Sequence, residues 1–233
     1  MTTISTEIII KNGKKYFDLQ QADENGRYRS WEHCYCVFAK YKDKKLTDDI
    51  VDFLCLHLAF YLASWGMLRG SSFLLQKDYK VHAIAVRELM KEKYKGLWAI
   101  KCKDYLKDDK NLNCLHSLTN ELEHIYKPFR ETARESIGKE NPGTPISQTL
   151  LTKILIGTLG CVPAYDEYFK KGVGECGIAP KTFGINSIHS LSKYYVENED
   201  IETWRQDISH EGVDYPQMKI LDMCFWQMGF DPA

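Results

Sequence analysis

Residues 146–159 have the sequence ISQTLLTKILIGTL, which is the most apolar helical pattern in this chain of 233 residues. Gly160 and Pro163 follow it and mark its end, because glycine and proline interrupt helices. A helix that is apolar on nearly every side belongs in the interior of a folded protein. The stretch therefore predicts a buried core helix that contains Leu155.

Helical patterns extend on both sides of this stretch. Thr47 is a suitable N-cap, and the acidic Asp48 and Asp49 favour the first turn of a helix that begins there. Helices are expected over residues 31–42, 47–63, 81–94, 113–135 with a break before Pro128, 146–159, 164–171, 187–196, 200–208 and 217–228. We therefore expect a mainly α-helical, compact single domain over 1–233, with helical parts at 29–138 and 139–233.

The N-terminal part, residues 1–28, is the exception to this helical pattern. Two β-prone runs, 7–11 and 14–17, flank the pair Asn12-Gly13. Asn-Gly between such runs favours a tight hairpin turn, because both turn positions require a positive φ. The sequence thus predicts a small N-terminal β-hairpin followed by a loop.

Composition limits the classes of function. Hydrophobic residues make up 44% and charged residues 27% of the chain, which is typical of a globular protein. The formal net charge of −1 argues against non-specific electrostatic binding of nucleic acid over a large surface, although a local basic face is compatible with it. No apolar stretch reaches the roughly 20 residues that span a bilayer, so we expect no membrane segment.

The cysteines and the first residues indicate the compartment. The eight cysteines form no Cys-x-x-Cys pair, and the start MTTISTEIIIKNGKK lacks the basic-then-apolar order of a signal peptide. We therefore expect a cytoplasmic protein with reduced thiols. His33, Cys34 and Cys36 fit no usual zinc spacing. Motifs for dinucleotides, P-loops, serine hydrolases and zincins are also absent, so we expect neither a metal nor a cofactor.

The segment 65–76 is a first candidate for binding. Gly66 and Gly70 predict a break at the end of the preceding helix, with Trp65 and Arg69 beside it. A broken helix exposes backbone donors, and an arginine binds phosphate or carboxylate through two hydrogen bonds. The alternative is a tight helix crossing in which Arg69 is paired with an acidic residue.

A second candidate lies between residues 142 and 169. Pro142-Gly143 precedes the apolar helix, and Asp166 lies 23 residues after Gly143 at the expected start of the next helix. This order resembles the core of helix-hairpin-helix DNA glycosylases, in which a Pro-Gly hairpin is followed by an apolar helix and by a short loop ending in a catalytic aspartate. The resemblance covers about 28 residues.

The resemblance implies a role for each matching residue. Asp166 would be the catalytic carboxylate, and the hairpin residues Pro142, Gly143 and Thr144 would hold the DNA backbone, with Lys153 as a helper. A glycosylase also needs an aromatic pocket for the extruded base. The candidate pocket residues are Trp65, Arg69, Tyr165 and Tyr168.

The sequence also departs from the family pattern. Pro145 replaces the second hairpin glycine, and Ser147 and Gln148 stand where strand-cleaving members have a lysine. The iron–sulfur cysteine cluster of some members is absent. The resemblance therefore implies a base-excising glycosylase without lyase activity and without a cofactor.

A non-catalytic interpretation explains the same residues. An acid at a helix start interacts favourably with the helix dipole, which accounts for Asp166 without any reaction. The protein would then be a helical module that binds DNA through the hairpin, or binds a protein partner. The net charge favours this alternative, whereas the position of Asp166 favours the enzyme.

Overall fold

The computed structural model describes residues 4–70, 72–136, 146–209 and 213–231. In these ranges the chain forms helices and no β-strand. The α-helices α1 to α11 cover, in chain order, Thr6–Gln21, Arg29–Tyr41, Asp48–Ser64, Ala83–Leu89, Cys102–Lys107, Asp109–Ser136, Gln148–Thr158, Glu167–Cys176, Ile185–Val196, Glu199–Ile208 and Gln217–Phe230. Three 3₁₀-helices, η1 to η3, cover Phe73–Gln76, Tyr79–His82 and Glu92–Leu97. The prediction of a mainly α-helical fold is confirmed for the described residues.

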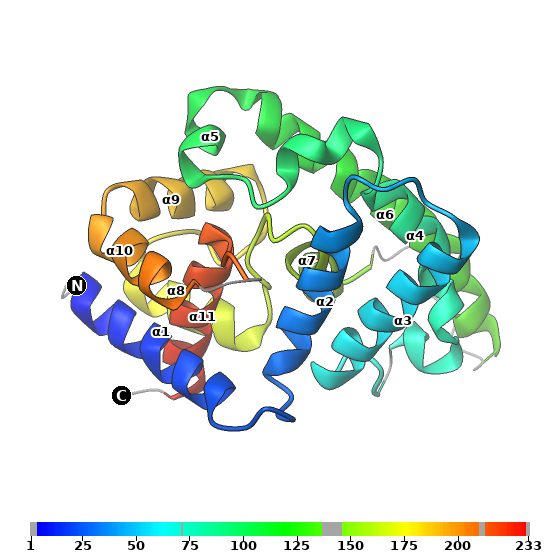
Figure 1. The fold of residues 1–233 in the computed structure, drawn as a ribbon, viewed down its shortest axis with the longest axis horizontal. Helices are drawn as coiled ribbons and strands as arrows, with labels where there is room; N and C mark the ends of the chain where they lie inside the picture. Colours follow the sequence, from blue (N-terminus) through cyan, green and yellow to red (C-terminus); the bar gives the residue numbers. More distant parts are fainter. Residues whose placement is uncertain (1–3, 71, 137–145, 210–212, 232–233) are drawn as a thin grey trace.

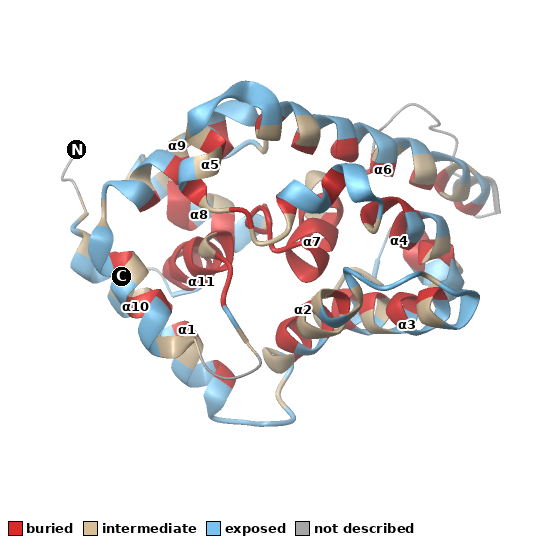
Figure 2. Ribbon diagram, turned by 45° about the horizontal axis from the view of Figure 1, so that its top comes forward, coloured by how far each residue is buried: buried red, intermediate tan, exposed pale blue. Residues whose placement is uncertain are grey.

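The helices α7 and α11 lie in the middle of the molecule, and the other helices surround them (Figures 1 and 2). Residues 150–158 of α7 and 218–229 of α11 are all buried. The helices α2 and α3 pack against α7, whereas α1 and α8 pack against α11. Leu155 is fully buried, which confirms the prediction of a core helix in this stretch.

The predicted N-terminal β-hairpin is wrong. Residues 6–21 form α1, and Asn12-Gly13 lies inside this helix. A side chain at Gly13 would collide with the ring of Trp204 and the sulfur of Cys224, at 2.5 and 2.6 Å. Glycine is therefore needed at position 13 for close packing between helices, and not for a turn with positive φ.

The break expected before Pro128 is also absent, since α6 continues through it to Ser136. Pro128 is exposed, so water can reach the carbonyl group that loses its amide donor there. The other predicted break is confirmed. The helix α3 ends at Ser64, and Gly66 and Gly70 follow with φ values of 74° and 59°.

The crossing of α8 and α11 brings two backbones into contact. A Cβ atom on Gly172 would lie 1.9 Å from the carbonyl oxygen of Phe225, and one on Gly229 would lie 2.0 Å from that of Tyr168. Both positions therefore require glycine. The close crossing fixes the start of α8, where Asp166 lies, against the C-terminal helix.

All eight cysteines are free thiols, and each is buried or half-buried. Within the described ranges, no helix combines the length and the apolar character that crossing a membrane requires.

Candidate functional site

Asp166 lies at the N-terminal end of α8, as the sequence predicts. It is the N-cap residue, and its Oδ1 accepts a hydrogen bond of 3.1 Å from the backbone N–H of Phe169. A carboxylate in this place satisfies a free amide of the first turn and interacts favourably with the helix dipole. The side chain keeps 14% of its surface exposed.

The other carboxylate oxygen of Asp166 has two further donors. Lys153 Nζ lies 2.9 Å from Oδ2, and the indole N–H of Trp226 donates to the same oxygen at 3.2 Å. The Lys153 side chain comes from the middle of α7 and is only 4% exposed. The carboxylate is therefore held by three elements of the fold: α7, α8 and α11.

A second lysine–aspartate pair lies beside the first. Lys219 Nζ is 2.8 Å from Asp222 Oδ2, and both side chains are buried. Asp222 Oδ1 accepts a hydrogen bond of 2.9 Å from the backbone N–H of Ala164, which fixes the loop that leads to Asp166. The charges of Lys153 and Asp166 act on the Lys219 ammonium, so the two pairs are electrostatic neighbours.

Burial shifts the titration of several groups around these pairs. It lowers the pKa of Lys219, and the nearby Asp222 carboxylate partly offsets this effect. Burial also raises the pKa of Tyr16 and Tyr61 well above the usual value, and Asp222 adds to both shifts. The tyrosines therefore remain neutral hydrogen-bonding groups.

Aromatic rings enclose the charged groups. Lys153 Nζ lies 5.0 Å from the centre of the Trp65 ring, and Lys219 Nζ lies 4.7 Å from that of Tyr16. Trp65 in turn meets Trp226 edge to face, with ring centres 5.6 Å apart. The indole N–H of Trp65 is buried and has no hydrogen-bond partner among the described residues.

The aromatic cluster continues to the surface on two sides. On one side Trp226 contacts Tyr168, with ring centres 5.3 Å apart, and the Tyr168 side chain is partly exposed. On the other side the exposed guanidinium of Arg27 lies 5.3 Å from the ring centre of Tyr28 and 5.4 Å from that of Trp65. The two ion pairs thus lie beneath a partly exposed group of aromatic rings, Tyr28, Trp65, Tyr168 and Trp226, which we call the aromatic surface.

Two exposed arginines lie near Trp65, one in contact with its ring and one beside the next residue, Gly66. Arg27 covers the ring itself, and the side chain of Arg69 turns back over the adjacent Gly66. Within the described part of the chain, neither forms an ion pair with an acidic residue, so the alternative of an Arg69 ion pair finds no support there. Both guanidinium groups remain available to an anionic ligand.

The sequence-predicted site residues fall into three groups. Lys153, Trp65, Asp166 and Tyr168 come together with Arg69 nearby. Tyr165 lies elsewhere: it is fully buried, and its hydroxyl is 2.6 Å from that of Ser187. Pro142, Gly143 and Thr144 lie outside the described residues. Lys153 faces Asp166, and its side chain is nearly inaccessible to solvent.

Sequence reasoning missed the other members of the site. Lys219 and Asp222 are charged residues three positions apart in an otherwise apolar final helix, which is a signal that the pattern contained. No comparable signal marks Trp226, Tyr16 or Arg27, because they reach the site through contacts between helices distant in sequence.

The described residues do not provide a set of side chains that could bind a metal ion. No group of three or more histidine, cysteine, aspartate or glutamate side chains within the described ranges is arranged to hold a metal ion. What the arrangement offers is a partly exposed carboxylate, two arginines and aromatic faces.

Comparison with known proteins does not assign the chain to a class. No protein family, curated protein or solved structure matches it. Functional inference therefore rests on the geometry around Asp166 and on the resemblance in residues 142–169.

Proposed function

We propose that the protein acts on DNA as a base-excising glycosylase without a lyase step, with Asp166 as its catalytic carboxylate. The observation that supports this most is the contact of Asp166 Oδ2 with Lys153 and Trp226 at the floor of the aromatic surface. It combines a fixed, partly exposed carboxylate with aromatic faces that suit an unstacked base.

The carboxylate suits the proposed reaction for a chemical reason. Positive charge develops on the sugar as an N-glycosidic bond breaks, and a nearby carboxylate stabilises that charge or orients a water molecule. Asp166 is anchored at both oxygens, so it needs little reorganisation. Lys153 is held against Asp166 and is nearly inaccessible to solvent, so it is not placed to attack a sugar, which fits a reaction without a covalent lyase intermediate.

Recognition of the DNA falls to the exposed groups in this proposal. Arg27 and Arg69 provide phosphate contacts, and the hairpin residues 142–144 add backbone contacts as the resemblance implies. Tyr168, whose side chain is partly exposed, offers a stacking face to a base that has left the duplex.

Removing the charged groups of this site from water costs free energy, and this cost supports a functional role. Two neighbouring lysine–aspartate pairs are largely removed from water, and apolar residues of similar size often stabilise a core equally well or better. Clusters of buried titratable groups are enriched at functional sites, and this cluster adjoins the partly exposed Asp166 and Tyr168.

A second candidate function is a non-catalytic DNA-binding module. The observation that favours it is that each carboxylate oxygen of Asp166 already accepts at least one hydrogen bond, and that Lys153 neutralises its charge. In this case Asp166 serves α8 as a cap, and only the arginines and aromatic rings meet DNA.

The two candidates are separated by one assay on the wild-type protein. Duplexes that each carry one of several damaged or modified bases are incubated with the protein, and abasic sites are detected by alkaline cleavage. The proposal expects abasic sites with at least one base and strand breaks only after alkali. Binding without abasic sites for every base would establish the binding module in its place.

A further inference from the structure

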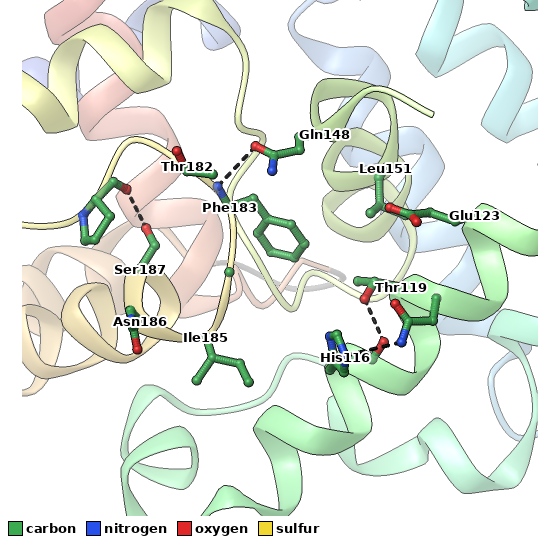
Figure 3. A pocket seen from close by; sticks show the side chains of 13 residues that line it. His116, Thr119, Glu123, Gln148, Leu151, Thr182, Phe183, Ile185, Asn186 and Ser187 are labelled. Carbon is green, nitrogen blue, oxygen red and sulfur yellow. Dashed lines mark hydrogen bonds between the residues drawn. The ribbon is translucent and has the colours of Figure 1, made fainter. Parts of the chain in front are cut away.

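A separate pocket of about 530 Å³ lies between α6, the start of α7 and the loop before α9 (Figure 3). Its volume lies within the roughly 300–1,000 Å³ of small-molecule sites. It shares no lining residue with the surface around Asp166, and behind its wall the Tyr165 ring packs against Phe183, with ring centres 5.2 Å apart.

One wall of the pocket is a polar stripe of α6. His116, Thr119, Asn120 and Glu123 follow one another at steps of three, one and three residues, so they share one side of the helix. His116 and Asn120 contact each other at 3.2 Å. Glu123 is half-buried, and its carboxylate has no hydrogen-bond or ion-pair partner among the described residues.

The opposite walls contribute apolar surface and an amide. The ring of Phe183 is directed into the space between α6 and the loop, as Figure 3 shows, and Leu151 and Ile185 add aliphatic contacts. Gln148 accepts a hydrogen bond of 3.2 Å from the Phe183 backbone N–H, which fixes the loop. Among the described residues that line the pocket there is no lysine or arginine, and His116 is a basic side chain.

We propose that this pocket binds a small aromatic cation, a flat ring that carries an amidinium or protonated amino group, with its positive charge on Glu123 and its ring against Phe183. An unpaired, half-buried carboxylate in a pocket whose described lining holds no lysine or arginine favours a cation. The Phe183 ring and the aliphatic residues favour a flat apolar body, and a cation is also attracted to an aromatic face. The proposal is independent of the activity assigned to Asp166.

The test compares three probes of nearly equal shape and different charge. Benzamidine is a cation, benzamide is neutral and benzoate is an anion. Binding is measured by titration while the methyl NMR signals of Leu151 and Ile185 are followed to locate each probe. We expect benzamidine to bind about tenfold more tightly than benzamide, as a charge-assisted hydrogen bond implies. Benzoate should leave both signals unchanged.

Two variants on the same helix complete the test. Glu123→Gln keeps the size of the side chain and removes its charge, and it should abolish the preference for benzamidine over benzamide. The matched control is Glu121→Gln, because Glu121 is exposed on α6 and does not line the pocket. It should bind all three probes as the wild type does. Equal binding of the three probes to the wild type, or an unchanged preference in Glu123→Gln, would overturn the proposal.

Discussion

The ammonium group of Lys153 lies 2.9 Å from the carboxylate of Asp166, across the loop that joins α7 to α8. The lysine is nearly inaccessible to water, and the aspartate keeps a small exposed area. This contact joins the largely buried helix α7 to the residue that caps the next helix. The position of the proposed catalytic carboxylate therefore depends on the packing of the core helix α7.

The ion pair predicts strong energetic coupling. Lys153→Met leaves the Asp166 carboxylate with an uncompensated charge, and removing one partner of a buried pair costs about 3–5 kcal/mol. The double variant Lys153→Met/Asp166→Asn should lose clearly less stability than the sum of the two single variants. Urea unfolding of the four proteins measures this difference. Additive losses would show that the two side chains do not interact in solution.

The apolar surroundings of Leu155 predict that a charge there is not tolerated. Leu155 is fully buried in α7, so Leu155→Asp places an unpaired carboxylate in the core. The cost is several kcal/mol, which is comparable with a typical domain stability of about 5–15 kcal/mol. We expect an unfolded or insoluble variant by circular dichroism and solubility. A soluble variant with the wild-type melting temperature would contradict the core position of α7.

The close crossing of α8 and α11 predicts that a single methyl group destabilises the protein. In Gly229→Ala the new Cβ would lie 2.0 Å from the carbonyl oxygen of Tyr168, so the two helices must separate. Overpacking of this kind costs about 1–3 kcal/mol or more. Gly96→Ala is the matched control, because its Cβ would only reach Asn111 at 3.8 Å. Thermal melts of the two variants should differ clearly, and equal melts would disprove the tight crossing.

A buried histidine predicts a pH dependence of stability. Burial lowers the pKa of His82 to about 4, and its Nδ1 lies 2.7 Å from the Tyr126 hydroxyl. The unfolded chain binds a proton at its ordinary pKa of about 6.5. Between these values the unfolded state holds more protons, so stability falls as the pH drops from 7 towards 4, by about 3 kcal/mol.

The measurement is the free energy of unfolding of wild type and His82→Gln at several pH values. The glutamine variant should lose the part of the slope between pH 6.5 and 4 that His82 causes, while a variant of the exposed His124, His124→Gln, should keep it. An identical slope in all three proteins would show that His82 does not titrate as its burial requires.

Local signals predicted the elements whose ends depend on nearby residues. Thr47 accepts a hydrogen bond of 3.3 Å from the Ile50 N–H as the N-cap of α3, and Asp166 caps α8 in the same way. Both follow from the chemistry of the cap residue and the pattern after it. The apolar run of α7 was also sufficient to predict its burial.

Other features depend on contacts that no short stretch of sequence reveals. The pair Asn12-Gly13 favours a turn locally, but Trp204 and Cys224 pack against Gly13 and α1 forms instead. The site depends in the same way on Trp226, which reaches Asp166 from 60 positions away in the chain. Local propensity is a weak determinant where tertiary packing opposes it.

The excision rate of Asp166→Asn decides whether Asp166 is a catalytic carboxylate. The substitution removes the charge, and its amide oxygen can still accept the Phe169 N–H, but it leaves the buried Lys153 without its acidic partner, so only protein that is folded by circular dichroism is assayed. Asp78→Asn is the matched control, since Asp78 caps η2 by accepting a hydrogen bond from the Lys80 N–H. Single-turnover base excision and DNA affinity are measured for both variants and the wild type. We expect Asp166→Asn to bind DNA as the wild type does and to form no abasic sites, while Asp78→Asn remains active. Full excision by a folded Asp166→Asn protein would contradict the account.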